Sequence, residues 1–272
     1  MVGEPVDSRQ YSAIIPTFNE VENIGKMIGR LSELYPGMKV LVMDDNSKDG
    51  TIELVRSISS TNPDVSLIVR EPNDRGLTAS VMDGIARVGT PYYLVMDSDF
   101  QHPPEVLKDL MASLAAGSDL VIGRRFHKEA LKGSRRFSSD TAQTLAHFYL
   151  RIHHQPHPGD IMSGLFGAKT ALSQAIVREK GDRFERKGFK VLFDILKFVP
   201  KDVTCSEVIY QFGDRKGGES KLSPIVVSSI LRQCGAGGKA MAVLANLFLL
   251  KRTGQVALIG IFVVIVAIVL FM

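Results

Sequence analysis

Short apolar runs alternate with longer segments of helical periodicity over the first 115 residues of the chain. Apolar runs of four or five residues are typical of buried strands, and apolar positions spaced three and four apart are typical of helices. The predicted strands are residues 11–15, 39–43, 65–69 and 92–96, and the predicted helices are residues 21–34, 51–58, 77–88 and 104–115. This alternation predicts an α/β fold whose mostly parallel sheet is flanked by helices and connected by right-handed crossovers.

The pattern becomes less regular after this part of the chain. Residues 120–122 are predicted to form a short strand, and residues 159–167 a turn that enters another strand. An amphipathic helix is predicted at residues 188–199 and a strand at residues 204–212. The glycine-rich loop at residues 213–221 favours a segment that closes over a ligand, with an exposed hairpin as the alternative.

The C-terminal residues 256–272 form a run of 17 positions without a charged or strongly polar side chain. As a helix this run would be about 25 Å long, at the short limit for crossing a bilayer, so a membrane anchor is favoured over a buried core helix. Lys251 and Arg252 precede the run, which places the N-terminal part in the cytosol by the positive-inside rule. Residues 241–250 are also mostly apolar and would lie at the interface or form the first arm of a membrane hairpin.

Composition narrows the classes of protein to consider. The chain is 45% hydrophobic and 23% charged, which is ordinary for a globular protein. Its formal net charge of +4 comes without a long basic run, so no nucleic-acid partner is expected. The chain has only two cysteines, Cys205 and Cys234, so a disulfide framework is not expected. No secretory signal is visible before the first predicted strand.

Polar residues follow three of the predicted strands at the point where each strand ends. The three stretches are residues 16–20 (PTFNE), 44–47 (DDNS) and 97–99 (DSD). Ligands of open α/β sheets bind outside the carboxyl ends of the strands, so these turns predict a nucleotide-type site. Asn19 and Asn46 could instead serve as helix caps, as could Asp49. The sequence contains no Walker A motif, and the dinucleotide fingerprint is absent after the first strand.

Asp97 and Asp99 are the strongest candidates for a metal site. Residues i and i+2 of a strand point to the same side, so the two carboxylates could converge on one cation. Oxygen ligands of this kind suit Mg²⁺ or Mn²⁺ held jointly with substrate phosphates. The alternative is that Asp99 caps the helix that Pro103 and Pro104 begin.

Basic residues gather in the two loops that are expected at the same edge of the sheet, where they favour anion binding over a merely solvated surface. These positions are Arg124, Arg125, Lys132, Arg135, Arg136, Arg215 and Lys221.

Taken together, six motifs resemble those of the dolichol-phosphate mannosyltransferases, a group of family 2 glycosyltransferases with the GT-A fold, a Rossmann-like α/β architecture. The motifs are PTFNE at residues 16–20, DDNSKDGT at 44–51, DRGL at 74–77, DSDFQHPP at 97–104, MSG at 162–164 and GESKL at 218–222. The resemblance extends from about residue 11 to residue 223. It implies a catalytic domain at residues 1–222, interfacial helices at 223–252 and a single transmembrane anchor at 253–272.

The resemblance also implies a role for each matching residue. The nucleotide of GDP-mannose would contact Pro16, Phe18, Glu20, Met43 and Asp45. The donor diphosphate and an Mg²⁺ or Mn²⁺ ion would lie among Asp97, Ser98, Asp99 and Gln101, with Asp97, Asp99 and Gln101 as the metal set. Arg215 and Lys221 would neutralise the donor phosphates, while Arg125, Arg135 and Ser139 would hold the acceptor phosphate. The residues expected to act directly in transfer are Asp99, Arg125, Arg215 and Lys221.

Two positions depart from the family pattern. Phe18 replaces a common tyrosine and keeps only the stacking face, and Ile161 replaces a common proline before the MSG turn. The expected reaction is the inverting transfer of mannose from GDP-mannose to dolichyl or another polyprenyl phosphate in a membrane, with no accessory subunit required. That membrane would be the endoplasmic reticulum in a eukaryote or the plasma membrane in a prokaryote. The alternatives are a glucosyltransferase that uses UDP-glucose and a non-catalytic subunit that binds a nucleotide sugar.

Overall fold

The computed structural model describes residues 6–126, 143–144, 146–188, 190–213 and 233. The chain divides into two compact units, residues 1–130 with 155–220 and residues 131–154 with 221–272. Apart from Gln233, the predicted membrane segments lie outside the described residues, so their boundaries stay predictions. Within the described ranges, no helix is long and apolar enough to span a bilayer.

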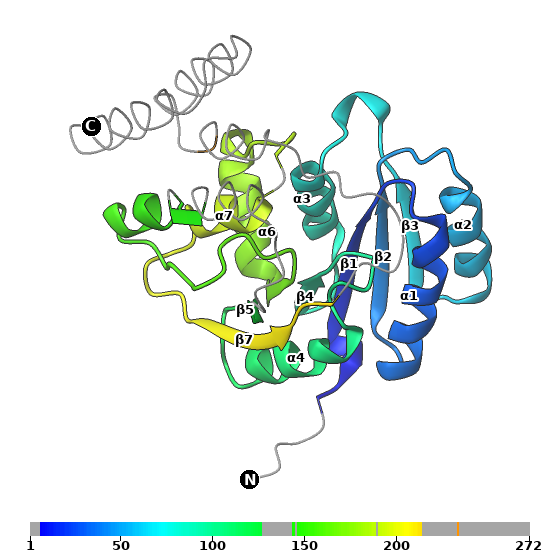
Figure 1. The fold of residues 1–272 in the computed structure, drawn as a ribbon, viewed down its shortest axis with the longest axis horizontal. Coiled ribbons are helices and arrows are strands. Elements are labelled where there is room, and N and C mark those ends of the chain that lie inside the picture. The colour runs from blue at the N-terminus through cyan, green and yellow to red at the C-terminus, as the bar shows by residue number, and fades with distance from the viewer. Residues whose placement is uncertain (1–5, 127–142, 145, 189, 214–232, 234–272) are drawn as a thin grey trace. The chain divides into compact units, whose positions relative to one another are not determined.

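The first unit is built on a seven-stranded sheet with the strand order β3-β2-β1-β4-β6-β5-β7 (Figure 1). The strands are β1 (Tyr11–Thr17), β2 (Lys39–Asp44), β3 (Val65–Val69), β4 (Tyr92–Val95), β5 (Leu120–Phe126), β6 (Phe166–Lys169) and β7 (Cys205–Gln211). β1 pairs in parallel with β2 and β4, and β2 pairs in parallel with β3, as the alternation predicts. β6 is antiparallel to both β4 and β5, so it is an exception to the parallel pairing, and the sequence pattern does not reveal its direction.

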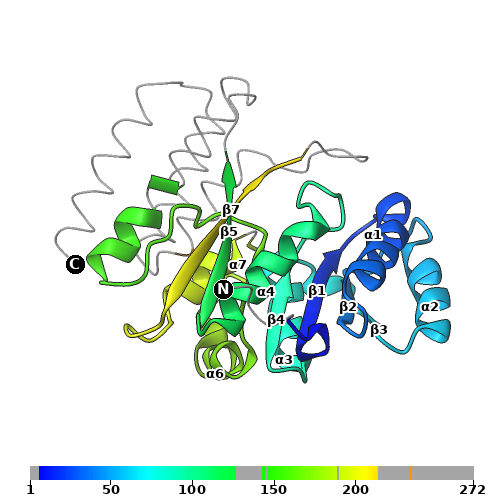
Figure 2. The same ribbon diagram turned by 90° about the horizontal axis from the view of Figure 1, so that it is seen from below.

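Helices cover both faces of this sheet (Figure 2). They are α1 (Val21–Leu34), α2 (Thr51–Thr61), α3 (Leu77–Arg87), α4 (Leu107–Ala115), α6 (Thr170–Lys180) and α7 (Val191–Leu196). α1 and α4 share one apolar core with Tyr11, Ala13 and Ile15 of β1. On the other face α3 packs so closely on β1 that a Cβ at Gly84 would lie 2.7 Å from Ile14. Alternate side chains of the buried strand β1 therefore fill the two cores.

Several boundaries differ from the sequence prediction. β4 ends at Val95, one residue earlier than expected. The predicted helix at 104–115 begins as a 3-10 turn, η3 (Pro104–Val106), before α4. β5 continues to Phe126 because residues predicted to be a loop pair in parallel with β7, including Arg125 opposite Tyr210. This long-range pairing fixes Arg125 on a strand instead of leaving it on a loop.

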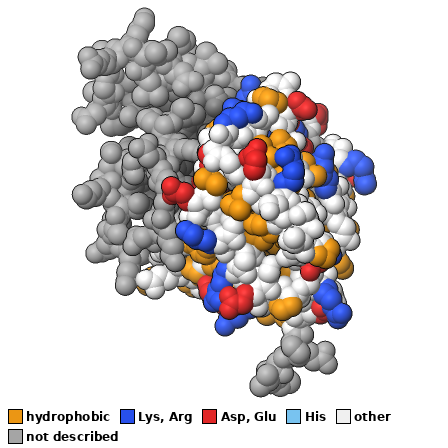
Figure 3. Space-filling view, turned by 90° about the vertical axis from the view of Figure 1, so that its right-hand side faces the viewer, with side chains coloured by type: hydrophobic (Ala, Val, Ile, Leu, Met, Phe, Trp, Pro, Cys, Tyr) orange, Lys and Arg blue, Asp and Glu red, His pale blue; other side chains and the backbone are white. Residues whose placement is uncertain are grey.

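The face of the first unit on the side of α1 and α2 carries charges of both signs (Figure 3). Lysine and arginine side chains alternate there with aspartate and glutamate, and hydrophobic side chains lie between them. One exposed pair on this side joins Arg30 of α1 to Glu33, with 2.8 Å between Nη1 and Oε2. Exposed ion pairs of this kind contribute little to folding, so the stability of this unit rests on its buried cores.

Candidate functional site

The turns that follow β1 and β2 are bound to one another. Asp44 is fully buried, and its two carboxylate oxygens accept hydrogen bonds of 2.7 Å from the backbone N–H and from the hydroxyl of Ser47. Burial raises the pKa of Asp44. The Ser47 hydroxyl accepts a bond of 2.8 Å from the Asn19 backbone, and the Asn19 side chain accepts one of 2.9 Å from the Lys48 backbone. These hydrogen bonds therefore hold the two turns together at the carboxyl edge of the sheet.

None of the three candidates is the N-cap residue of a helix, because Glu20 is the N-cap of α1 and Gly50 is the N-cap of α2. Asp49 accepts bonds of 3.1 Å from the backbone N–H groups of both Val21 and Thr51, at the starts of α1 and α2. Asn19 and Asn46 instead have positive φ angles of 53° and 64°, and they form the turns themselves. Short polar side chains tolerate this left-handed conformation, which explains asparagine at both positions.

Five residues predicted to bind a nucleotide lie at this edge, namely Pro16, Phe18, Glu20, Met43 and Asp45. Pro16 pairs with Met43 in the β1–β2 ladder. Met43 is fully buried and lies beneath the edge of the sheet. Glu20 accepts a bond of 3.0 Å from the amide of Asn23. The guanidinium of Arg75 lies 5.0 Å from the centre of the Phe18 ring and donates to the Asn46 carbonyl at 3.2 Å.

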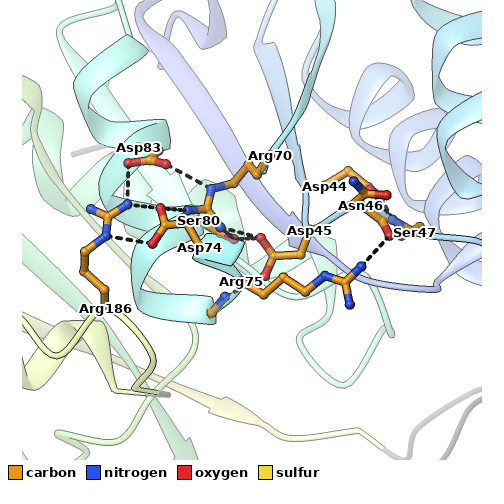
Figure 4. A network of polar contacts seen from close by, with 11 residues as sticks. Asp44, Asp45, Asn46, Ser47, Arg70, Asp74, Arg75, Ser80, Asp83 and Arg186 are labelled. Atoms are coloured by element: carbon orange, nitrogen blue, oxygen red, sulfur yellow. Dashed lines mark hydrogen bonds and ion pairs between the residues drawn. The ribbon is translucent and has the colours of Figure 1, made fainter. Parts of the chain in front are cut away.

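Asp45 belongs to a network of charged residues that the sequence did not reveal (Figure 4). Its Oδ1 accepts from Arg70 Nη1 at 2.5 Å and from the Ser80 hydroxyl at 2.8 Å, and its Oδ2 accepts from the Gly76 N–H at 2.9 Å. Arg70 also donates to Asp83 at 2.9 Å and to Asp74 at 2.7 Å. Arg186, more than a hundred positions from Asp74, binds both of these carboxylates as well.

Asp97 and Asp99 lie beyond the end of β4, so the argument that they share one face of a strand is wrong. They occupy a bend in which Phe100 has a φ of 62°. The Asp97 side chain is 42% exposed, whereas Asp99 is 3% exposed and accepts a bond of 3.1 Å from the Gln101 backbone. The alternative role of Asp99 as a helix cap is also wrong, because Pro103 is the N-cap of η3.

His102 connects the first of these aspartates to the far part of the sheet. It is buried, with Nε2 at 3.4 Å from Oδ2 of Asp97 and Nδ1 at 2.6 Å from the hydroxyl of Tyr210. A Cβ at Gly164 would lie 3.1 Å from Oδ2 of Asp97 and 3.2 Å from Nε2 of His102. The MSG turn therefore lies directly against Asp97, and a side chain at Gly164 would require Asp97 and His102 to shift by a few tenths of an ångström.

Arg125 forms a two-bond ion pair with Asp160, the second residue of the predicted turn at residues 159–167. Nε–Oδ2 is 2.7 Å and Nη2–Oδ1 is 2.9 Å, with 22% of the Arg125 side chain and 3% of the Asp160 side chain exposed. Burial opposes both charges, yet the paired hydrogen bonds outweigh it, so the pKa of Asp160 is lowered and that of Arg125 is raised. The pairing uses two of the five N–H donors of the guanidinium.

Lys190 is a site residue that the sequence analysis missed. Its ammonium donates to the Met162 carbonyl at 3.1 Å, and it interacts electrostatically with Arg125, Asp160 and Asp97. Burial, with help from the Arg125 charge, lowers its pKa to about 8. Lys190 is the N-cap of α7, where the helix dipole disfavours a cation. A lysine at the start of a mostly apolar helix was the sequence signal that could have identified it.

The structure thus brings Asp97, Arg125 and Lys190 into one electrostatically interacting group, and Ser98, which follows Asp97 in the chain, is buried at 3% exposure. Arg135, Ser139, Arg215 and Lys221 lie outside the described residues. Within the described ranges, no group of three or more histidine, cysteine, aspartate or glutamate side chains is arranged to hold a metal ion by itself.

Comparison with known proteins identifies the class to which this fold and site belong. Residues 12–177 match the model of the glycosyl transferase family 2 domain. Among solved structures, a glucosyl-3-phosphoglycerate synthase from Mycobacterium tuberculosis has the same fold, with a TM-score of 0.59, 20% identity, and coverage of 85% of this chain and 83% of that one. This confirms the predicted GT-A-like α/β fold for the first unit.

The curated relatives define the group within that class. A dolichol-phosphate mannosyltransferase of Saccharomyces cerevisiae is 34% identical over 83% of this chain and 86% of its own length. One of Pyrococcus furiosus is 34% identical over 81% of this chain, which spans 61% of that longer relative. An undecaprenyl-phosphate mannosyltransferase of Micrococcus luteus is 30% identical over 79% of this chain and 88% of its length. The chain belongs to glycosyl transferase family 2, in the group of the dolichol-phosphate mannosyltransferases.

Proposed function

We propose that this chain transfers mannose from GDP-mannose to dolichyl or another polyprenyl phosphate, with inversion at the anomeric carbon. The observation that carries the proposal is that three curated relatives are all named as mannosyltransferases that act on a polyprenyl phosphate. The yeast and Pyrococcus relatives are named for dolichol phosphate and the Micrococcus relative for undecaprenyl phosphate, but all are mannosyltransferases. The sugar and the polyprenyl-phosphate class are therefore common to all three, whereas the length and saturation of the lipid are not.

The distribution of charge at the edge of the sheet supports this function. Asp45 and its neighbours after β2 present carboxylates, which suit the N–H groups of a base. Arg125 and Lys190 present cations on the side of β5, which suit phosphate groups. Because β1 lies between β2 and β4 in the sheet, a nucleotide at the first group could extend its diphosphate toward Asp97.

The residues after β4 fit a divalent metal. Mg²⁺ and Mn²⁺ are commonly held by one or two carboxylates together with substrate phosphates, so a complete protein cage is not needed. Asp97 and Asp99 supply two such carboxylates, and Asp97 is exposed enough to reach a ligand. Gln101 would complete the set that the family resemblance implies. The ion would neutralise charge on the departing diphosphate. The M. tuberculosis neighbour, which was solved with Mn²⁺, shares this fold.

The acceptor determines what the protein has to do in the transfer. A phosphate monoester is already anionic near pH 7, so no general base is needed to activate it. The task that remains is to align the acceptor and to stabilise charge. Within the described part of the chain, the pairing with Asp160 leaves three N–H donors of Arg125 for a phosphate, and Lys190 adds a second cation that interacts with Arg125. Arg135 and Ser139 would complete the acceptor site, and Arg215 and Lys221 would contact the donor phosphates.

The predicted anchor at residues 253–272 agrees with a lipid acceptor. An enzyme confined to the membrane surface meets a membrane-bound acceptor at a raised effective concentration. The catalytic unit would face the cytosol, in the endoplasmic reticulum of a eukaryote or at the plasma membrane of a prokaryote.

A donor panel tests the proposal. The full chain in detergent, with a short polyprenyl phosphate and Mg²⁺ or Mn²⁺, is given labelled GDP-mannose or UDP-glucose, and the lipid product is identified by mass spectrometry. We expect a mannosyl lipid from GDP-mannose alone. A glucosyl lipid from UDP-glucose would replace the proposal by the glucosyltransferase alternative, and no product from either donor would favour the non-catalytic subunit.

A further inference from the structure

Arg70 is a buried arginine to which the proposed reaction assigns no role. It follows β3 directly, and its backbone N–H donates to the Asp44 carbonyl at 2.8 Å, which places it beside the end of β2. Its side chain is only 3% exposed and lies among Asp45, Asp74 and Asp83 (Figure 4). A buried guanidinium is costly to desolvate, so this position is tolerable only because several charged partners surround it.

The charges of this network disfavour a phosphate-binding role for its arginines. Arg70 and Arg186 contribute two positive charges, while Asp45, Asp74 and Asp83 contribute three negative ones, so the network carries one net negative charge. An anionic ligand would be repelled. The network is suited instead to a ligand edge that presents N–H or O–H groups.

Asp45 is the member of the network that can reach such a ligand. A carboxylate has about four acceptor positions, and three of those on Asp45 are used by Arg70, Ser80 and Gly76. Among the described residues, the position that remains is on Oδ2, and 11% of the side chain is exposed. Asp45 can therefore accept one hydrogen bond from outside the protein, in a direction that its three internal bonds determine.

We propose that Arg70 is a positioning residue of the nucleotide site, which orients Asp45 so that Oδ2 accepts a hydrogen bond from the nucleoside part of the donor. This rests on the proposed function, because it takes the ligand to be a nucleotide sugar. Arg70 reaches the three carboxylates from three separate nitrogen atoms, Nε, Nη1 and Nη2, whereas a lysine has a single nitrogen that cannot occupy all three positions.

A second contact supports the same arrangement from a distant part of the chain. Gly76, the donor to Oδ2, belongs to a turn that packs against residues 186–188. Ala79 and Thr78 of α3 donate backbone hydrogen bonds of 3.1 Å to the carbonyls of Arg186 and Gly188. The side chain of Arg186 binds Asp74 in the same turn. Both the cation at Oδ1 and the N–H at Oδ2 are therefore fixed by long-range contacts.

The test is a double-mutant cycle on the full chain in detergent, with the dissociation constant for GDP measured by calorimetry. We expect Arg70→Lys to weaken GDP binding about tenfold when Asp45 is present, and less than about twofold in an Asp45→Ala background. The KM for GDP-mannose should rise in parallel, while the KM for the lipid stays constant. Arg87→Lys is the matched control, since Arg87 is an exposed residue of α3 that donates to the Asp83 carbonyl at 2.9 Å. The Arg87→Lys variant should bind GDP normally.

Ser80→Ala provides a milder variant in case Arg70→Lys does not fold. It removes one donor to Oδ1 without changing the charge, and we expect GDP binding to weaken about threefold. An equal loss in the Asp45→Ala background, unchanged GDP binding in both variants, or a rise in the lipid KM alone would overturn the inference. If the wild type binds GDP in this Arg70-dependent way but transfers no mannose, the proposed function fails and the positioning role stands.

Discussion

The ion pair between Arg125 and Asp160 offers the sharpest test of how this site is held together. The two residues are 35 positions apart and come from β5 and from the turn before β6. Asp160→Asn keeps the size and shape of the side chain but removes its charge, and it places an amide N–H₂ opposite one N–H of the guanidinium. The variant therefore leaves Arg125 as an uncompensated cation in a mostly buried position.

The magnitude follows from the burial of the two partners. Breaking a buried pair by removing one partner costs about 3–5 kcal/mol. Arg125 retains 22% exposure and can recover part of its hydration, so we expect a loss of about 2–3 kcal/mol in the free energy of unfolding. For a domain of this size each kcal/mol lowers the melting temperature by about 2–4 °C, which gives a decrease of about 5–10 °C.

The assay is thermal and denaturant unfolding of the detergent-solubilised protein, followed by circular dichroism, together with the KM for the lipid. The lipid KM should rise in Asp160→Asn because Arg125 is no longer oriented. Glu33→Gln is the control, since its carboxylate is 70% exposed beside Arg30 and should contribute less than about 0.5 kcal/mol. An Asp160→Asn protein that melts within 1 °C of the wild type, with an unchanged lipid KM, would refute the reasoning.

Three further predictions follow from other parts of the site. Lys190→Met should stabilise the fold at pH 7, because a lysine whose pKa falls from 10.5 to about 8 carries its full desolvation penalty below pH 8 and none above pH 10.5. Denaturant midpoints should show this gain shrinking from pH 8 to pH 10.5, and a gain independent of pH would contradict it. Asp99→Ala should abolish mannose transfer while the circular dichroism spectrum is retained; full transfer in the presence of chelator would remove Asp99 from the metal site. Gly164→Ala should lower kcat about tenfold, because its Cβ would lie 3.1 Å from Oδ2 of Asp97, and unchanged steady-state kinetics would show that this carboxylate can move without loss.

Local pattern alone was sufficient for the repeating strand–helix units. The predicted helix at residues 21–34 and the predicted strand at residues 65–69 match α1 and β3 at both ends. Their apolar positions repeat with the period of a single element, so no distant partner is needed to recognise them. The parallel pairing among the strands β1, β2, β3 and β4 could be predicted from the helices that connect them. The polar turns after β1, β2 and β4 could be predicted from the positions at which these strands end.

The strands in the second half of the sheet could be predicted only in part, because their extent and direction depend on the strands with which they pair. Residues 123–126 carry a glycine and two arginines and show no strand pattern, yet they extend β5 because β7 provides a parallel ladder beside them. β6 has only four residues, and its antiparallel direction depends on a chain reversal that leaves no periodic signal. The helix predicted at residues 188–199 is shorter in the structure, where α7 spans Val191–Leu196, because packing against other elements determines its ends.

The sequence by itself determined the α/β class, the motifs of a family 2 glycosyltransferase and the edge of the sheet at which its candidate residues gather. The tertiary structure alone decided which partners hold those residues: Arg70 against Asp45, His102 between Asp97 and Tyr210, and Asp160 against Arg125. The physical reason is the range of the interactions. Backbone periodicity is local and can be read from neighbouring residues, whereas a buried ion pair joins residues that are far apart in the chain and leaves no spacing to recognise.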